Sequence, residues 1–407
     1  MPTPVPPGLQ IGTAEPRDAL AQFARRNLLA PSFLWEDVYA AEHAAGFAVA
    51  GVAQLDVLKL FRDGVDHALA SGGSLADFSK AIKPQLVAKG WWGDVEITDP
   101  ATGDTRIGRF DDNRLKLIYD VNLRQSYAAG RWARSERTAA AKPMMMYRTM
   151  RDERVRHSHA AWDGVVLQLD DPWWDTHYPP NGWRCRCRAF AVSERDVARY
   201  VDDGVEIKRD APPVSYTEFV NRGTGETSRV PLGIDPGFDY NPGKVGLQRV
   251  AELQRNALDS APPDVAVAVV QQHLGDDNFK RFVAAPLPLQ AQPVGMLPAR
   301  AAAATDSRTL MLATATARQQ QVANPELVAA DYLWVQRAID TGQLVPDGDH
   351  ASVYLLEADG WVAVVRVQRS GRTVALASYR RLTAEQAAGD AEVQRLRTAL
   401  SGPAPGG

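Results

Sequence analysis

The stretch from residue 143 to residue 192 constrains the fold most, because it combines large core-forming side chains with residues that interrupt regular structure. It holds four of the ten tryptophans, three of the seven histidines and both cysteines of the chain. Proline and glycine recur along it, so neither a long helix nor a long strand can form there. We predict a compact, loop-rich module with short strands at 146–149, 165–169 and 185–192. The four tryptophans are Trp162, Trp173, Trp174 and Trp183.

The chain before this stretch is predicted to be mainly helical. Apolar residues between Val52 and Leu69 recur at three- and four-residue steps, which is typical of one face of a helix. Ser74, with Asp77 three residues later, forms a capping box that starts the next helix. Residues 94–109 read as a hairpin or loop. A third helix follows, with Leu115, Ile118 and Val121 facing inward.

The C-terminal part combines a helix at 324–340 with three strand-like runs at 352–357, 361–367 and 373–379. The fold class is therefore α+β: a mainly helical N-terminal part, a loop-rich Trp/His/Cys central module, and a small C-terminal domain of helix plus antiparallel meander. The predicted boundaries are a Pro-rich disordered arm at 1–18, a helical domain at 19–142, the central module at 143–243, a helical segment at 244–283, a linker at 284–306, the C-terminal domain at 307–400 and a tail at 401–407.

Composition excludes several classes of protein. With 46 basic and 49 acidic residues the net charge is −3, which argues against bulk, non-specific binding of nucleic acid. Two cysteines cannot form a disulfide framework. The most apolar stretch, 46–53, is far shorter than the ~20 residues that span a bilayer, so we expect no membrane partner. The first residues lack a basic region followed by an apolar one, so we expect no secretory signal. We therefore expect the protein to be synthesised and used in the cytoplasm, or in a particle assembled there.

The two cysteines, Cys185 and Cys187, suggest a metal site. Residues i and i+2 of a strand face the same side, so both thiolates can bind one ion. The imidazoles of His159 and His177 would complete a tetrahedral shell for a structural zinc ion. The alternative is an aromatic core in which the cysteines are small packing units. We do not predict catalysis by His159, Asp163 and Asp175, because no nucleophile elbow or His-Glu-x-x-His motif accompanies them.

Arginines flank this candidate metal site on both sides. They either pair with the nearby aspartates, which we favour, or form a docking face for an acidic partner or a nucleic-acid backbone. These arginines are Arg148, Arg151, Arg154, Arg156, Arg184, Arg186 and Arg188.

The C-terminal domain offers a second set of polar residues. Metal-independent ribonucleases need a base, an acid and cations beside the scissile phosphate. The candidates here are Arg318, Asp331, Tyr379 and Arg380. The alternative, which we favour, is that these residues are surface charge on a binding domain.

The central module also contains several short blocks in a fixed order. They are Arg154-x-Arg156-x-x-His159, Asp163-Gly164, Asp171-Pro172-x-Trp174, Pro179-Pro180-Asn181-Gly182-Trp183 and Cys185-Arg186-Cys187. Together they resemble the signature of phage Mu F-like minor head, or head morphogenesis, proteins. Weaker blocks extend the resemblance from about Phe33 to Gly243, including Asp235-Pro236-Gly237-Phe238.

The resemblance implies a phage or prophage protein that acts in procapsid assembly. It implies binding to the portal and to capsid or scaffold proteins, a place inside the phage head after assembly in the host cytoplasm, and contact with packaged DNA.

The C-terminal domain is similar to the nuclease-like domains of the barnase, colicin and RelE kind. Such a domain would act on RNA after delivery by the particle. Where that pattern has histidine before Pro-Glu-Leu, this chain has Asn324. Asparagine cannot act as a general base or acid near neutral pH. We therefore expect a domain retained for binding rather than an enzyme.

Overall fold

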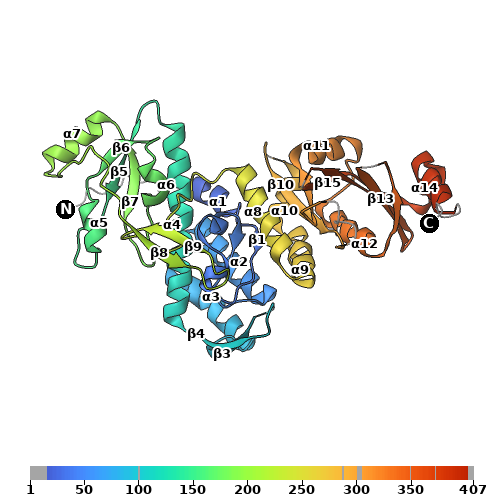
Figure 1. Cartoon of the computed structure of the whole chain (residues 1–407), viewed down its shortest axis with the longest axis horizontal. Helices are drawn as coiled ribbons and strands as arrows, with labels where there is room; N and C mark the ends of the chain where they lie inside the picture. The colour runs from blue at the N-terminus through green and yellow to red at the C-terminus, as the bar shows by residue number, and fades with distance from the viewer. Residues whose placement is uncertain are drawn as a thin grey trace, which may run out of the picture. The chain divides into compact units, whose positions relative to one another are not determined.

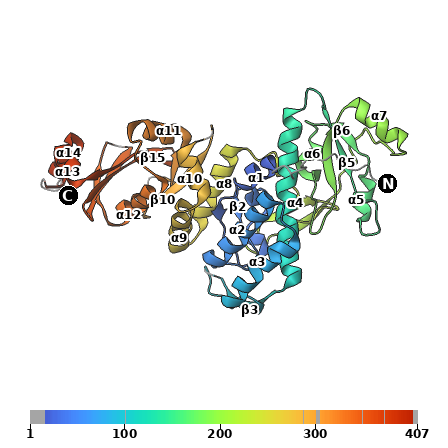
Figure 2. The ribbon, with the colours of Figure 1, turned by 180° about the vertical axis from the view of Figure 1, so that it is seen from behind.

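The computed structural model describes residues 16–99, 101–286, 288–299, 305–348, 350–371 and 373–401 (Figures 1 and 2). These residues form two compact units. The first contains residues up to 23, 59–96 and 107–244, and the second contains 24–58, 97–106 and 245 onward. A mainly helical part is combined with sheets whose strands are mostly antiparallel, which confirms the predicted α+β class. Most of the predicted arm at 1–18, and the predicted tail beyond residue 401, lie outside the described residues.

The N-terminal part is mainly helical, as predicted. Its helices are α1 (Arg17–Phe23), α2 (Leu55–Ser71), α3 (Leu75–Ala88) and α4 (Asp112–Arg137). The stretch between α3 and α4 is the hairpin of β3 (Gly93–Thr98) and β4 (Thr105–Phe110). The Ser74 side chain accepts the Asp77 backbone N–H at 3.3 Å, so the predicted capping box is present. Shorter elements are β1 (Leu28–Leu29), parallel to β2 (Gly46–Phe47), and the 3-10 turns η1 (Trp35–Asp37) and η2 (Ala40–Ala44).

Helices α1 and α4 of the first unit lie side by side (Figure 2). Gly130 of α4 permits this approach, since a Cβ atom there would lie 2.7 Å from the backbone nitrogen of Ala19. Any larger residue would force the two helices apart.

The central module is built on a three-stranded antiparallel sheet of order β6-β5-β7. Its strands are β5 (Met144–Arg148), β6 (Val166–Gln168) and β7 (Arg188–Val192). The module also contains the short helices α5 (His157–Ala161), α6 (Trp173–His177) and α7 (Glu194–Asp202). A hairpin of β8 (Tyr216–Val220) and β9 (Thr227–Pro231) completes it. The three predicted strands are present: β5 begins two residues earlier than predicted and ends one residue earlier, whereas β6 and β7 are shorter than predicted. Because β7 begins at Arg188, both cysteines precede the strand on which they were expected.

Strand β5 is buried on both faces. Met145 and Tyr147 face the aromatic core, whereas Met144 and Met146 face a smaller apolar cluster under α7. This is the two-residue periodicity of a strand covered on both sides. The aromatic core contains Trp132, Trp162, Trp173, Trp174, Tyr147, Tyr178 and Phe238 together with both cysteines.

The second unit contains a six-stranded sheet of order β10-β11-β15-β14-β13-β12. Strands β11 and β15 are parallel and the other neighbours are antiparallel. The strands are β10 (Ala291–Met296), β11 (Thr309–Ala313), β12 (Gln343–Pro346), β13 (Ala351–Ala358), β14 (Trp361–Ser370) and β15 (Thr373–Thr383). The helices are α8 (Leu247–Ser260), α9 (Pro263–Leu274), α10 (Asp277–Ala284), α11 (Thr314–Ala323), α12 (Leu333–Thr341), α13 (Ala384–Gly389) and α14 (Ala391–Ser401), with the 3-10 turn η3 (Ala329–Tyr332) before α12.

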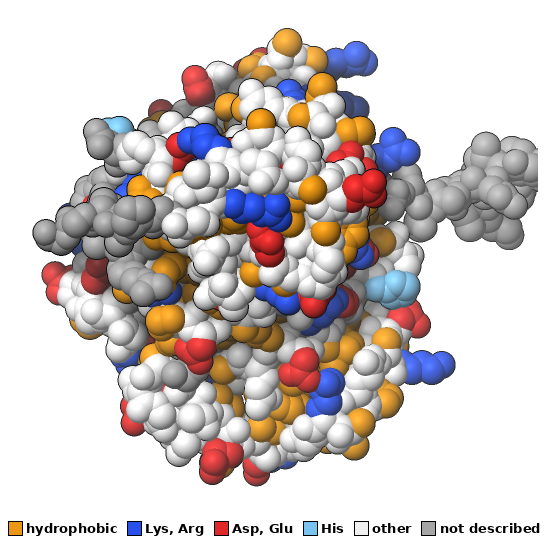
Figure 3. Space-filling model, turned by 90° about the vertical axis from the view of Figure 1, so that its right-hand side faces the viewer, with side chains coloured by type: hydrophobic (Ala, Val, Ile, Leu, Met, Phe, Trp, Pro, Cys, Tyr) orange, Lys and Arg blue, Asp and Glu red, His pale blue; other side chains and the backbone are white. Residues whose placement is uncertain are grey.

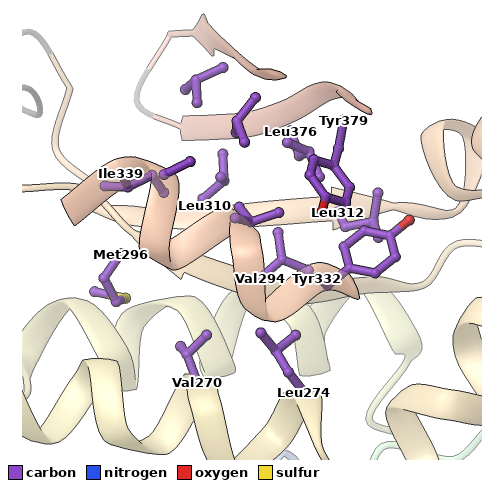
Figure 4. Packing of buried hydrophobic residues seen from close by; sticks show 14 of the residues in the cluster. Val270, Leu274, Val294, Met296, Leu310, Leu312, Tyr332, Ile339, Leu376 and Tyr379 are labelled. Carbon is purple, nitrogen blue, oxygen red and sulfur yellow. The ribbon is translucent and has the colours of Figure 1, made fainter. Parts of the chain in front are cut away.

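Both faces of this sheet are covered by helices. Val270 and Leu274 of α9 point toward Val294 and Met296 of β10, within the larger apolar cluster (Figure 4). On the opposite face, α13 and α14 cover the smaller cluster that includes Val353 of β13.

Several predicted boundaries in the second unit are wrong. The expected linker at 284–306 contains β10, an edge strand whose Pro293 and Gly295 suggested a flexible segment but whose Val294 and Met296 are buried. The predicted helical segment at 244–283 is divided into α8, α9 and α10, and Asp276 accepts the Asn278 backbone N–H and caps α10. The three-strand meander is present, within a larger mixed sheet. Within the residues described, no helix is both long and apolar enough to cross a membrane.

Candidate functional site

His159, Cys185 and Cys187 come together in the central module. The Nδ1 atom of His159 lies 3.7 Å from Cys185 Sγ and 3.6 Å from Cys187 Sγ. All three residues are buried, and their candidate ligand atoms lie within 4.8 Å of one another. The described residues contain no other group of three or more His, Cys, Asp or Glu side chains that meets this geometry.

The imidazole of His159 is held in place by its second nitrogen. Its Nε2 lies 2.9 Å from the backbone oxygen of Gly233, a distance at which Nε2–H donates to that carbonyl. The ring also stacks on Trp162, with centroids 5.0 Å apart and an interplanar angle of 20°. Nδ1 is therefore left with its lone pair directed at the two sulfur atoms.

The two cysteines lie on a fixed loop between α6 and β7. The Cys185 backbone N–H donates to Gly182 O at 3.1 Å, and Cys185 O accepts Arg124 Nη1 at 2.8 Å. Between the cysteines, Arg186 forms a two-pronged ion pair with Asp152. The loop is thus tied to α4 on one side and to the turn before α5 on the other.

The thiols form a strongly coupled pair. A hydrogen bond from Cys187 lowers the pKa of Cys185 well below its usual value, and the same interaction raises the pKa of Cys187. Burial raises the pKa of Tyr147, so this neighbouring phenol stays protonated.

His177, the fourth predicted ligand, lies outside this group. Its ring stacks on Trp173 with centroids 4.5 Å apart, and its Nδ1 is 2.8 Å from Thr176 Oγ1. Burial lowers its pKa to about 4. His177 is therefore a neutral part of the aromatic core, and its inclusion in the predicted metal shell is not supported by the geometry.

The other signature residues hold the loops of the module. Arg156 binds both carboxylate oxygens of Asp235, at 2.7 and 2.8 Å, and Asp235 also accepts the Trp183 backbone N–H. Gly182 lies so close to the Asp235 carboxylate that a Cβ atom at this position would be 2.3 Å from Oδ2. Asp163 accepts the Thr149 N–H and pairs with Arg151.

Three further signature residues have local structural tasks. Gly164 has a φ of +81°, and a Cβ atom there would lie 2.0 Å from Glu206 O, so only glycine fits. Asp171 accepts the Trp173 N–H at 2.8 Å at the start of α6, and Trp174 donates its indole N–H to Gln168 O. Pro180 follows a cis peptide bond and is buried.

The arginines around the site are largely paired with aspartates, as favoured from the sequence. Arg148, Arg151, Arg156 and Arg186 each have an aspartate partner within 3.3 Å. The Arg154 side chain is 81% exposed, and its Nη2 lies 3.8 Å from Asp152 Oδ2, farther than in the other four pairs. Arg184 and Arg188 are exposed and, within the described part of the chain, form no ion pair.

A basic cavity adjoins the cysteines. It has a volume of about 470 Å³ and is lined by His159, Cys185 and Cys187. Six cationic side chains also line it, against the single carboxylate of Asp120: Lys116, Arg124, Arg154, Arg156, Arg184 and Arg186. Lys116 and Arg124 pair with Asp120, and Arg156 and Arg186 pair with Asp235 and Asp152, so much of this positive charge is balanced by aspartates.

The four C-terminal candidates do not form one exposed cluster. Tyr379 is fully buried and donates its hydroxyl to Asp331 O at 2.8 Å, and burial raises its pKa. Asp331 is buried and pairs with Arg381. Arg380, the next residue of β15, pairs with Asp390 and Glu392, and Arg318 donates to Pro286 O. Each group has a structural partner, and Tyr379 and Asp331 are buried, so these two are not the surface charge that the alternative expected.

Asp235 and Gly233 were missed as site residues. The block that begins at Asp235 was visible in the sequence, but its contact with Arg156 joins positions 79 residues apart. A contact between residues so far apart in the sequence cannot be predicted from the spacing of residues within a short motif.

Comparison with known proteins agrees with the motif resemblance. Residues 59–190 match the family described as "Phage Mu protein F like protein". The chain is 33% identical over 270 residues to a protein named as capsid assembly protein F of Escherichia phage Mu, covering 63% of this chain and 60% of that protein. It is 31% identical over 226 residues to the Mu-like prophage FluMu F protein of Haemophilus influenzae, covering 52% and 53%. The matches thus span a little over half of these relatives. No solved structure matches the chain.

Proposed function

We propose that this chain, whose residues 59–190 carry the Phage Mu F-like region, is a capsid-assembly protein of a phage or prophage. The observation that carries the proposal is the match to proteins named for capsid assembly or as F proteins of Mu-like phages. The same region holds most of the aromatic core, the paired arginines and the His-Cys-Cys group. On this proposal, that region is the part of the chain that takes its place in the assembling head.

The mechanism we propose is docking rather than catalysis. A binding surface gains affinity when its loops are already ordered before the partner arrives. Here the ion pairs of Asp235, Asp163 and Asp152 order the loops. Arg184 and Arg188, which form no ion pair with any residue that the structure describes, then remain available to carboxylates of the portal or inner shell, or to phosphates of packaged DNA.

The C-terminal sheet domain is proposed to be a binding appendage inside the head. On the face seen in Figure 3, basic and acidic side chains are interspersed rather than gathered by sign. Mixed charge of this kind suits a protein partner better than a nucleic-acid backbone. Cleavage of RNA by the full chain, lost on Arg318→Ala, would favour the ribonuclease alternative instead.

The docking proposal is tested by isolating heads from cells in which the encoding phage or prophage is induced. We expect the chain to co-purify with heads and to be cross-linked to the portal protein. The double variant Arg184→Ala/Arg188→Ala should reduce this association while leaving the melting temperature unchanged. Arg195→Ala, an exposed arginine on α7, is the matched control. Equal association of all three proteins would contradict a role for the two unpaired arginines.

A further inference from the structure

We propose that His159, Cys185 and Cys187 bind a zinc ion that ties α5 to the loop before β7. The three side chains reach this point from α5 and from the loop before β7, two segments that also meet through ion pairs, loop hydrogen bonds and the aromatic core. A shared ion would make them one rigid element, and this inference does not depend on the assembly role.

The distances fit a tetrahedral zinc centre. With Zn–S near 2.3 Å and Zn–N near 2.05 Å, tetrahedral angles place sulfur and nitrogen ligands about 3.6 Å apart. The observed separations from Nδ1 are 3.7 and 3.6 Å. The two nitrogen–sulfur separations are therefore already close to the spacing that the ion requires.

The protonation pattern also fits a metal ligand. Because the N–H at Nε2 donates a hydrogen bond to Gly233 O, Nδ1 presents a lone pair to both sulfur atoms. Metal-binding histidines commonly use their second nitrogen in this way, which fixes the tautomer and the ring orientation. Without an ion, two S–H groups compete for that single lone pair.

Charge balance explains how the group can be buried. Two thiolates and a neutral imidazole around Zn²⁺ carry no net charge, so burial of the centre avoids the penalty of an isolated ion. Two thiolates with a single nitrogen ligand favour zinc over calcium or magnesium, which prefer oxygen. Since all three residues line the basic cavity, the fourth position faces that cavity, where we expect a water molecule.

The first test is metal analysis of the purified full chain. We expect about one zinc ion per chain, and cobalt substitution should give the thiolate charge-transfer and tetrahedral d–d bands of a two-sulfur site. Removal of the ion by a chelator should lower the melting temperature, and added zinc should restore it. A folded chain that neither contains zinc nor takes up zinc or cobalt would overturn the proposal.

Matched variants separate a ligand role from a packing role. Cys185→Ser and Cys187→Ser nearly conserve volume, and each should weaken zinc binding at least about tenfold and change the cobalt spectrum. His157→Ala and His177→Gln should retain the ion and the spectrum, because neither side chain belongs to the group. If the serine variants bind cobalt with an unchanged spectrum, the sulfur atoms are not ligands and the proposal is wrong.

Discussion

Among single residues, the side chains that contact two or more segments matter most to the central module. Asp235 is the clearest case, since it binds the guanidinium of Arg156 and the backbone N–H of Trp183. His159 similarly joins α5 to the turn at Gly233. Loops without regular hydrogen bonding are ordered here by side chains that replace the missing backbone partners.

Trp174 and Trp183 belong to the same signature but should respond differently to substitution. Trp174 is fully buried and contacts Trp173 and Tyr178, whereas Trp183 is 37% exposed and packs edge-on against Phe238. Trp174→Ala should lower the free energy of unfolding by about 3–5 kcal/mol, and Trp183→Ala by about 1 kcal/mol. Urea unfolding measures both values. Similar losses for the two variants would contradict this assignment of core and surface.

The pKa of His177 predicts an acid-sensitive core. Burial lowers it to about 4 from its usual 6.5, so in this window the unfolded chain binds a proton that the folded chain does not. The free energy of unfolding should therefore fall as pH drops, by about 2 kcal/mol near pH 5 from this residue alone. His177→Gln should remove that part of the pH dependence, measured as the difference between urea unfolding near pH 7.5 and near pH 5.

The exposed His157 provides the control for this measurement. The effect of His177→Gln is read as its difference from the His157→Gln variant. If His177→Gln has the same pH dependence as the parent chain, His177 is already charged in the folded state, and its place in the aromatic core has been misassigned.

Among the elements, β10 sets the size of the C-terminal domain. It pairs with β11 and buries Val294 and Met296 under α9. A chain of residues 245–401 should therefore unfold cooperatively on heating, whereas a chain of residues 307–401 should lack a cooperative transition, because it loses β10 and the covering helix. Circular dichroism during heating distinguishes the two. A sharp transition in the shorter chain would show that β10 is dispensable.

Sequence patterns predicted those elements whose determinants are local. The capping box at Ser74 and the hairpin at 94–109 depend on residues a few positions apart, and both were found. β10 was missed because its Pro293 and Gly295 are atypical of a strand, and only pairing with β11 buries its apolar residues. The predicted strand at 185–192 included both cysteines, but β7 begins only at Arg188. The proximity of the cysteines to His159 was still predicted, because the metal hypothesis used the chemistry of the residues as well as strand geometry.

In the whole molecule, the resemblance read from short motifs agrees with the family match over residues 59–190. The ordered blocks carried this information because each has a definable task in the structure. Gly164 occupies a conformation that only glycine adopts easily, and Gly182 leaves room for the Asp235 carboxylate. Outside the matched region, the six-stranded sheet packs against helices on both faces, and its larger core cluster also includes Leu28 of β1.

The most direct test of the assembly role is the yield of heads after deletion of the gene from the phage or prophage that encodes it. We expect deletion to reduce DNA-filled heads, counted by electron microscopy, at least about tenfold. Expression of the intact chain in trans should restore the yield, and the Trp174→Ala variant should not. Normal numbers of DNA-filled, infectious particles from the deletion strain would contradict the account.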